Sequence, residues 1–402
     1  MYNDDRVRVL YLQSNSEIGG SDVALLRLVE SLDRTRFRPV IVLPSDGPLT
    51  KDFERRGAKV VVVSEMLKLT TQKGSIHYLR FLANYPLAVW RLLRLIRREH
   101  IDLIHTNTLH NLYGYLAAKL AGVPHVWHVR EIVRQSAFFG RIEAFLARYF
   151  ADRIIAVSAA AAQMFRGKTG EYPPRLRIMW DGVNLNQFHP GNNGHRIRSE
   201  LGLPREAPLV GLVCRLDHWK GVEVFLQAVS ICRKECPDAR YIICGGEVEG
   251  REQVARRAQR LAEELDLTDV VHFTGWHYRP EDMPEVHATL NVLVLSSTWP
   301  EPFGLVLIEA MASGKPVVAT DQGGPVEICV EGSTALLIPP QNPRRMADAL
   351  ITLLGDPQRA AAMGRAGRRR AEEFFDERRY MRELQLLYED VLNRRGLGAP
   401  QT

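Results

Sequence analysis

Short apolar runs alternate with longer stretches of helical period along almost the whole chain. Six runs of strand length fall in the first half: Val7 to Leu12, Val40 to Leu43, Val60 to Val63, Leu103 to His105, His125 to Val129 and Arg153 to Val157. After the polar turn Asn192-Asn193-Gly194, five more follow: Leu209 to Leu212, Tyr241 to Cys244, Val270 to Phe273, Leu290 to Leu295 and Pro316 to Ala319. This βα alternation is typical of parallel sheets covered by helices. The pattern predicts two doubly wound α/β domains that meet near residues 185–205.

The segment from Trp299 to Ala312 carries two glutamates, Glu301 and Glu309, with seven residues between them. Two prolines end the preceding strand, and a helix is expected to begin near Gly304. Glu301 then lies on a loop at the carboxyl end of a strand, where open α/β sheets bind ligands. Glu309 lies about one turn inside the helix.

A helix start of this kind can serve a nucleotide. Its free backbone N–H groups suit a diphosphate, and a carboxylate just inside it can accept hydrogen bonds from both hydroxyls of a ribose. The segment could thus hold a nucleotide and its sugar. For any isolated pair of acids the alternative is a surface loop and a helix whose glutamates are only solvated, so the rest of the chain must decide.

The glutamate pair, with Phe303-Gly304 between, resembles the signature of the retaining glycosyltransferases of family 4, also called glycosyl transferases group 1. Further segments follow in the order of that family: Val210 to Gly221 with the basic residues Arg215 and Lys220, Cys244 to Gly246, Phe273 to Trp276, and Gly323 to Glu327. The resemblance implies an α/β structure of the GT-B fold, in which two Rossmann-like doubly wound parallel-sheet domains face an interdomain cleft. It implies an acceptor-binding domain at 1–188, a nucleotide-sugar-binding domain at 189–375, and a C-terminal helix at 376–402 that crosses back to the first domain.

The resemblance also implies roles for single residues. Glu301 would bind hydroxyls of the donor sugar, His128 would lie at the opposite edge of that sugar, and Glu309 would bind the ribose. Gly275 and Trp276 would lie near the nucleobase. The remaining donor-binding positions would be Gly19, Gly20, Phe303, Gly304 and Leu305.

In the first domain, the turn Gly19-Gly20 follows the first strand and precedes an apolar helical stretch from Val23 to Leu32. Glycine lets the backbone approach a ligand closely, and the family's matching turn meets the donor diphosphate or the acceptor. His128 ends a strand and so lies on the ligand-facing edge of its sheet. A lone histidine there is more often structural, but its place relative to the other motifs favours a functional role. Candidates for shaping the acceptor pocket, also after strand ends, are His105, His110, Arg130 and Glu131.

Transfer from a sugar nucleotide leaves negative charge on the departing diphosphate, which the site must neutralise. Arg215 offers a planar fork and Lys220 a mobile point charge for phosphate oxygens. The sequence lacks an Asp-x-Asp triplet and clustered histidine and acidic ligands, so we expect transfer without a metal or cofactor. By resemblance the reaction retains configuration, and a phosphate oxygen takes the proton of the acceptor. The catalytic candidates are His128, Arg215, Lys220 and Glu301.

The formal net charge of +6 is unevenly distributed. Residues 1–190 hold 27 Lys and Arg against 17 Asp and Glu, a net charge of +10, whereas the remainder holds 26 against 30, a net charge of −4. Within the first part, the stretch from Arg80 to Arg98 is a candidate docking site, and inside it a basic amphipathic helix is expected to start at Pro86. Its basic residues would be Arg91, Arg94, Arg97 and Arg98. Its apolar face would be formed by Trp90, Leu93 and Ile96.

Such a helix suits peripheral contact with an anionic membrane, and a core-packed helix with a solvated basic face is an equally good interpretation. No nucleic-acid-binding motif accompanies the charge, so nucleic acid is not an expected partner. The segment Met1 to Arg6 is too polar to open a signal peptide, and no apolar run is long enough to span a membrane. We therefore expect a cytoplasmic protein, at the inner face of the membrane if the helix binds there. The five cysteines are odd in number and lack metal-ligand spacing, so buried reduced thiols are expected.

Three functions are compatible with these motifs. The first is a glycosyltransferase that moves a sugar from a UDP- or GDP-sugar to a hydroxyl of a glycan or lipid-linked acceptor, in cell-surface polysaccharide or glycolipid biosynthesis. The second is a nucleotide-sugar epimerase on the same scaffold, which would convert the donor without any acceptor. The third is a non-catalytic nucleotide-sugar-binding protein, which would never release nucleoside diphosphate. The transferase is favoured because binding alone does not require the cations Arg215 and Lys220 together with both acids.

Overall fold

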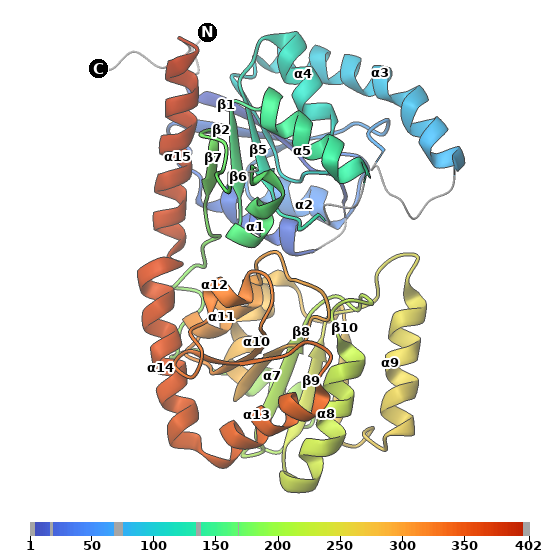
Figure 1. Cartoon of the computed structure of the whole chain (residues 1–402), viewed down its shortest axis with the longest axis vertical. Helices are drawn as coiled ribbons and strands as arrows, with labels where there is room; N and C mark the ends of the chain where they lie inside the picture. Colours follow the sequence, from blue (N-terminus) through green and yellow to red (C-terminus); the bar gives the residue numbers. More distant parts are fainter. Residues whose placement is uncertain (1–4, 17–18, 68–74, 134–137, 168, 397–402) are drawn as a thin grey trace. The chain divides into compact units, whose positions relative to one another are not determined.

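The computed structural model describes residues 5–16, 19–67, 75–133, 138–167 and 169–396. The chain forms two units (Figure 1), one of Met1–Trp180 with Arg378–Thr402 and one of Asp181–Glu377. The division falls at 180/181, ahead of the boundary at 188/189 that the sequence suggested. The reason lies in Val183, whose N–H donates to the Phe375 carbonyl at 2.8 Å and whose carbonyl accepts from the Glu377 N–H at 3.1 Å. These bonds tie the stretch after Trp180 to the end of the second unit.

The first unit contains a parallel sheet of seven strands in the order β3-β2-β1-β4-β5-β6-β7. The strands are β1 Val7–Leu12, β2 Phe37–Leu43, β3 Lys59–Val62, β4 Leu103–Thr106, β5 His125–Val129, β6 Arg153–Ala156 and β7 Leu176–Ile178. The helices are α1 Gly20–Ser31, α2 Pro48–Arg55, α3 Ser75–Glu99, α4 Tyr113–Ala121, α5 Phe138–Phe150, α6 Ala159–Ala162 and α15 Glu377–Arg394, with a 3₁₀ turn at Gln163–Phe165.

Helices cover both faces of this sheet. Because successive strand residues point to opposite faces, Val9 and Tyr11 of β1 pack with α1, α2 and α15, whereas Leu10 and Leu12 pack with α3 and α4. Figure 1 shows α15 on the opposite side of this sheet from α3 and α4. The C-terminal helix thus completes the core of the first unit.

The second unit contains a parallel sheet of six strands in the order β10-β9-β8-β11-β12-β13. The strands are β8 Leu209–Val213, β9 Arg240–Cys244, β10 Val271–Gly275, β11 Val292–Leu295, β12 Val317–Thr320 and β13 Ala335–Ile338. The helices are α7 His195–Glu200, α8 Val222–Glu235, α9 Glu252–Glu264, α10 Met283–Thr289, α11 Leu305–Ala312, α12 Pro325–Ile328, α13 Pro343–Gly355 and α14 Pro357–Phe374, with a 3₁₀ turn at Pro280–Asp282.

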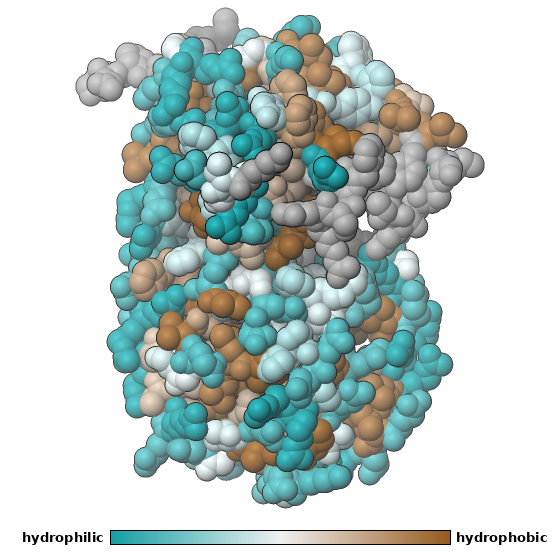
Figure 2. All heavy atoms as spheres, viewed as in Figure 1, coloured by the Kyte–Doolittle hydropathy of each residue, from teal (hydrophilic) through white to brown (hydrophobic). Residues whose placement is uncertain are grey.

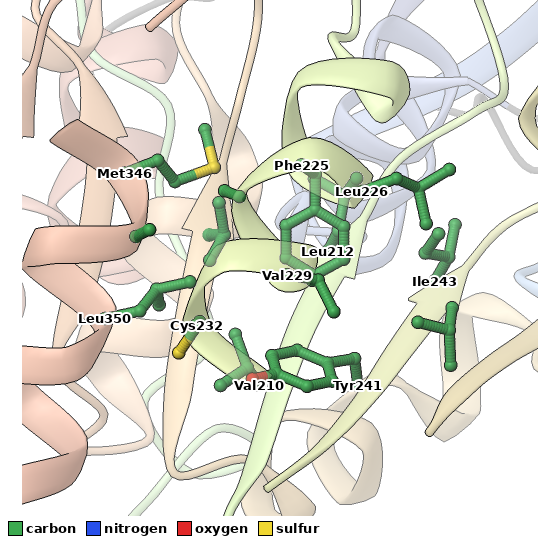
Figure 3. Packing of buried hydrophobic residues seen from close by; sticks show 14 of the residues in the cluster. Val210, Leu212, Phe225, Leu226, Val229, Cys232, Tyr241, Ile243, Met346 and Leu350 are labelled. Carbon is green, nitrogen blue, oxygen red and sulfur yellow. The ribbon is translucent and has the colours of Figure 1, made fainter. Parts of the chain in front are cut away.

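The core of the second unit lies between its sheet and two of its helices, as Figure 3 shows. Val210 of β8 and Tyr241 of β9 meet Phe225 of α8 and Met346 of α13, all buried. Apolar burial of this extent is the main stabilising contribution in such a layer. It fixes β8 and α8, and with them the loop that joins these two elements.

Every strand that the sequence predicts is present, and two further strands, β7 and β13, were missed. Both are short edge strands, and each is the last strand along the chain in its own sheet. β7 has only three residues, two of them exposed, so it lacks the apolar run by which strands were recognised. The expected helix start near Gly304 is confirmed, since α11 begins at Leu305.

The expected helix start at Pro86 is wrong, because Pro86 lies inside the helix α3. Proline in a helix removes one backbone hydrogen bond. However, Phe81 precedes it and is buried in the same hydrophobic cluster as Val89 and Leu92. Packing on both sides of the proline therefore keeps the helix continuous. Among the described residues, no helix is both long and apolar enough to cross a bilayer.

The cysteine prediction is confirmed in part. All five cysteines are free, as expected. Cys232, Cys244 and Cys329 are buried, but Cys214 and Cys236 are only half-buried. Burial raises the pKa of the Cys329 thiol to about 12, so this thiol is unreactive near neutral pH.

Candidate functional site

In both sheets the strand order reverses direction once, between β1 and β4 and between β8 and β11. Open α/β sheets bind ligands outside the carboxyl ends of the strands at such a point. In the second unit, Arg215 and Lys220 follow β8, and Glu301 follows β11. In the first unit, Gly19 and Gly20 lie between β1 and α1. The predicted residues thus cluster at these points, each set in its own unit.

Lys220 and Glu301 form a nearly buried ion pair in the second unit. The Lys220 ammonium donates to both carboxylate oxygens of Glu301, at 3.0 and 2.8 Å. Their side chains are only 17% and 10% exposed. Ser297 donates to Oε2 of Glu301 at 2.8 Å, and the Lys220 ammonium lies 4.0 Å from the centre of the Trp219 ring. Since a charge at such low exposure needs a partner, each of the two compensates the other.

Backbone geometry brings these two loops together. Gly221 has a φ of +70°, and a Cβ there would lie 1.9 Å from the Ser296 carbonyl oxygen. The Ser296 hydroxyl donates to the Lys220 carbonyl at 2.8 Å, and the Thr298 N–H donates to the Trp219 carbonyl at 2.7 Å. Only glycine allows this close approach.

Arg215 begins the loop after β8 and is half-buried. Within the part of the chain that the structure describes, its guanidinium has no ion pair or hydrogen bond. The loop itself is anchored by Asp217, which accepts from Arg251 at 2.5 and 2.6 Å and from the His218 ring at 2.7 Å. Burial would raise the pKa of Asp217, but the charge of Arg251 and these bonds hold it below its ordinary value. Arg215 therefore lies on a fixed loop, and its guanidinium is available to bind an anion.

Gly304 provides the entry to helix α11. Its φ of +106° is strained for other residues, and it stands at the N-cap position before Leu305. The neighbouring Phe303 ring is 4% exposed and packs edge-on against Phe375, with ring centres 6.3 Å apart. That ring therefore serves packing, so a ligand contact of Phe303 would have to come from its backbone. The donor-binding roles of Phe303, Gly304 and Leu305 remain predictions.

Glu309 is buried, at 3% exposure, and its Oε2 lies 2.9 Å from Nε2 of His287 on helix α10. His287 is fully buried, and its Nδ1 has no partner among the described residues. His287 was missed from the sequence, because it lies in a helix without any motif around it. The contact with His287 holds one oxygen of the Glu309 carboxylate in place. The ribose contact expected of Glu309 remains a prediction.

Trp276 offers an exposed aromatic plane. Its side chain is 48% exposed, and its indole N–H donates to the Glu247 carbonyl at 2.9 Å. A Cβ on Gly246 would lie 2.5 Å from the indole ring, so the ring rests directly on that glycine. Gly275, with a φ of +58°, makes the turn that precedes it. Such a fixed, open ring can stack on a planar group. The nucleobase contact expected of Gly275 and Trp276 remains a prediction.

His128 of the first unit belongs to a buried polar network. Its Nδ1 lies 3.3 Å from His105 Nε2 and 3.5 Å from Arg130 Nη2. Its Nε2 is buried and has no partner among the described residues. An unsatisfied buried polar atom costs about 1–3 kcal/mol. Burial, and next the charge of Arg130, hold the pKa of both His105 and His128 well below the ordinary value, so both rings are neutral.

The network continues from Arg130 toward the start of α1. Arg130 Nε donates to the Asn107 side chain at 2.9 Å, and Asn107 donates to Gln13 at 3.0 Å. Gln13 in turn donates to Asp22 in the first turn of α1. The carbonyl of Gly19 accepts from the Asp22 N–H at 3.1 Å, which links the glycine turn to the network. Gln13, Asp22 and Asn107 were missed from the sequence.

The other first-unit candidates hold loops in place. His110 lies 3.0 Å from both carboxylate oxygens of Glu143. Glu131 accepts from the backbone N–H groups of Leu109 and Arg130, at 2.9 and 3.1 Å. These bonds stabilise the segments after β4 and β5, and a role in an acceptor pocket remains a prediction. In the described segments, no group of three or more His, Cys, Asp or Glu side chains is placed to hold a metal ion.

Comparison with known proteins defines the family. The model described as "Glycosyl transferases group 1" matches residues 194–370, and that described as "Glycosyltransferase Family 4" matches residues 18–187. The alpha-maltose-1-phosphate synthase of Mycolicibacterium smegmatis is 30% identical over 305 residues, which cover 69% of this chain and 76% of that protein. The D-inositol 3-phosphate glycosyltransferase of Streptomyces avermitilis is 32% identical, covering 69% of this chain and 63% of that protein. The chain belongs to the group 1 glycosyltransferases.

Solved structures agree with this assignment. HepE of Anabaena, solved with UDP and glucose, has a TM-score of 0.82 and 25% identity, covering 95% of this chain and 99% of HepE. The predicted fold class, two Rossmann-like parallel-sheet domains of the GT-B type, is confirmed. The interdomain cleft remains a prediction. The chain spans between about half and two thirds of the length of four inositol-phosphate glycosyltransferases that it matches, from 45% to 66%.

Proposed function

We propose that the protein transfers a sugar from a nucleoside-diphosphate sugar to a hydroxyl group of a glycan or lipid-linked acceptor, with retention of configuration and without a metal or cofactor. Family membership supports transfer of a sugar. The observation that carries the proposal is the cation pair at the switch point of the second sheet. There Lys220 is held by Glu301, and Arg215 has no partner in the described part of the chain.

This arrangement suits a departing diphosphate. As the bond between the anomeric carbon and the phosphate oxygen breaks, its electron pair moves to that oxygen. Arg215 and Lys220 would neutralise the new charge, and the backbone N–H groups at the start of α11 would add to them. When the diphosphate takes the Lys220 ammonium, Glu301 becomes available to accept hydrogen bonds from sugar hydroxyls. The ion pair of the unliganded protein thus keeps both groups in place for the substrate.

Retention follows if the acceptor oxygen forms its new bond on the face from which the diphosphate leaves. The proton of the acceptor hydroxyl then passes to a phosphate oxygen, so no side chain needs to act as the base. His128 would contact the donor sugar. Exclusion of water from the site would favour transfer over hydrolysis.

The donor can be identified by thermal shift. HepE was solved with UDP-glucose, so UDP and UDP-glucose are the first ligands to compare with GDP and ADP. A ligand that binds the folded state raises its melting temperature, by an amount that grows with its concentration over Kd. We expect a rise with uridine nucleotides that is lost in Glu309→Ala. No rise with any of the nucleotides would contradict the proposal.

A transfer assay separates the three candidate functions. Release of nucleoside diphosphate that depends on an acceptor supports the transferase, whereas conversion of the donor without acceptor would show an epimerase. Binding without any release would show a non-catalytic protein. We expect Lys220→Ala and Glu301→Gln to lower kcat by at least about a hundredfold, as for other groups that stabilise transition-state charge. Full activity after exhaustive EDTA treatment is expected, and its loss would overturn metal independence.

The surface of α3 supports a membrane-bound acceptor. Four large apolar side chains of this helix are exposed, Leu79 at 64%, Leu82 at 65%, Leu87 at 44% and Trp90 at 52%, and Figure 2 shows hydrophobic residues along α3. The two other residues of the predicted apolar face differ, since Leu93 is half-buried and Ile96 is buried. Exposed arginines share the helix: Arg80, Arg91, Arg94, Arg97 and Arg98.

Apolar side chains beside arginines suit the interface of a bilayer with anionic lipids. Glu99 is the acidic residue of α3, and Lys59 already neutralises it at 2.7 Å. We therefore propose peripheral contact of α3 with the cytoplasmic face of an anionic membrane, where a lipid-linked acceptor would be reached.

Vesicle sedimentation tests this contact. The protein is expected to sediment with phosphatidylcholine vesicles that contain phosphatidylglycerol and to remain in solution with phosphatidylcholine alone. Leu82→Glu should abolish the binding. Leu386→Glu, an equally exposed leucine (63%) on α15, is the matched control and should leave it intact. Sedimentation that does not depend on anionic lipid, or equal loss in both variants, would refute the contact.

A further inference from the structure

Three buried rings stand in a row in the first unit. The Tyr388 hydroxyl of helix α15 lies 2.7 Å from His105 Nδ1, and His105 Nε2 lies 3.3 Å from His128 Nδ1. All three side chains are fully buried. Adjacent rings stand edge to face, with centres 5.8 Å apart for Tyr388 and His105 and 5.3 Å apart for the two histidines. The row connects the C-terminal helix to the strand-end histidine.

The contact with Arg130 indicates which ring nitrogen of His128 carries the proton. Arg130 Nη2 lies 3.5 Å from His128 Nδ1, and a guanidinium can only donate hydrogen bonds. Arg130 is itself fixed by Asn107, which accepts from its Nε at 2.9 Å. His128 Nδ1 is therefore an acceptor. A neutral imidazole carries one N–H, so the proton of His128 lies on Nε2.

The rest of the row follows from this assignment. Because His128 Nδ1 accepts, His105 must donate from its Nε2, and its Nδ1 is then free of a proton. That atom accepts from the Tyr388 hydroxyl at 2.7 Å. The Tyr388 hydroxyl also lies 3.3 Å from the Tyr11 hydroxyl oxygen, a longer contact than the one with His105. If His128 instead donated from Nδ1 to His105, that N–H would point toward the N–H of Arg130, and two donors would face each other.

We propose that Tyr388 is a positioning residue: through His105, and together with Arg130, it holds His128 as the tautomer with the proton on Nε2, ready to donate to an oxygen of the bound ligand. His128 Nε2 is the buried atom without a partner among the described residues. An acceptor oxygen, such as a sugar hydroxyl, would satisfy it. His128 then acts as a neutral hydrogen-bond donor and neither as a base nor as a cation. The identity of that ligand rests on the function proposed above, whereas the tautomer does not.

The tautomer can be observed without any ligand. In the full-length protein labelled with ¹⁵N-histidine, two-bond ¹H–¹⁵N correlations distinguish a protonated ring nitrogen from an unprotonated one, and His128→Gln assigns the signals of His128. We expect the proton on Nε2 in both His105 and His128. In Tyr388→Phe, His105 Nδ1 loses its donor, so both rings should shift toward a mixture of tautomers. A His128 protonated on Nδ1, or rings unchanged by Tyr388→Phe, would overturn the proposal.

Tyr380→Phe is the matched control. Tyr380 lies about two turns earlier on the same helix and packs in the same hydrophobic cluster. Tyr380→Phe removes the same group from the same helix, so only Tyr388→Phe should alter the ring spectra. In the transfer assay it should lower kcat by about tenfold, the usual effect of one hydrogen bond, with a smaller change in the KM for the donor. If the wild type transfers no sugar, the proposed function fails while the ring spectra still decide the role of Tyr388.

Discussion

At the scale of the residue, Glu309 and His287 show how a buried charge is held. Removing one partner of a buried pair leaves the other uncompensated, which costs about 3 kcal/mol or more. We therefore expect His287→Ala to lower the free energy of unfolding by about 3 kcal/mol, measured by urea denaturation. The double variant His287→Ala/Glu309→Ala should recover part of that loss. A loss below about 1 kcal/mol in the single variant would mean that the pair contributes no more than an exposed one.

The same pair separates a structural role from a binding role. Glu309→Gln keeps the size of the side chain and its hydrogen bond with His287, which lies 2.9 Å away, because the ring can serve as donor or acceptor. We expect this variant to remain folded and yet to lose most of the melting-temperature rise given by a nucleotide. An unchanged rise in melting temperature would mean that Glu309 has a structural role only and does not bind the nucleotide.

At the scale of the element, the loop from β8 to α8 depends on one glycine. A Cβ at Gly221 would lie 1.9 Å from the Ser296 carbonyl oxygen, so Gly221→Ala must move the loop and with it Lys220. We expect a loss of unfolding free energy of about 2–4 kcal/mol, from backbone strain and the displaced contact. Gly202→Ala is the matched control, because Gly202 has a φ of +61° and open space around it. That control should lose only about 1 kcal/mol. Equal losses in the two variants would refute the role of the Ser296 contact.

The same element shows what the sequence could and could not predict. Lys220 and Glu301 were found because each lies in a local motif, a basic loop after a strand and a proline-bounded turn before a helix. Their partners could not be found in this way. His287 and Tyr388 lie in helices without any motif, and only the packing of those helices brings them to Glu309 and to His105. Of the two missed edge strands, β7 has three residues, two of them exposed, and so lacks the buried apolar run that marks the others. The other, β13, is an apolar run of four residues, Ala335–Ile338, and could have been predicted from the sequence.

At the scale of the whole molecule, the two units should respond differently to acid. The first unit buries three neutral histidines, His105, His125 and His128, whose pKa burial lowers, for His125 to about 3. In the unfolded chain His125 becomes protonated near pH 6.5, whereas in the folded protein it becomes protonated only near pH 3. Stability is therefore complete above pH 6.5 and falls as the pH drops, by about 1.4 kcal/mol per pH unit and histidine.

His125 alone should thus cost the first unit about 3 kcal/mol between pH 6.5 and pH 4.5. In the second unit, the pKa of Asp217 is lowered. Its contribution to the stability of that unit is therefore lost only as the pH falls below the ordinary pKa of a carboxyl group. Hydrogen exchange, corrected for its intrinsic pH dependence, should therefore show β4 and β5 opening at a higher pH than β8 and β9. In His125→Gln, the unfolding free energy of the first unit should fall less steeply as the pH drops, because unfolding then takes up about one proton fewer. Opening of the second unit first would show that its carboxylates, and not the buried histidines, set the acid limit of the protein.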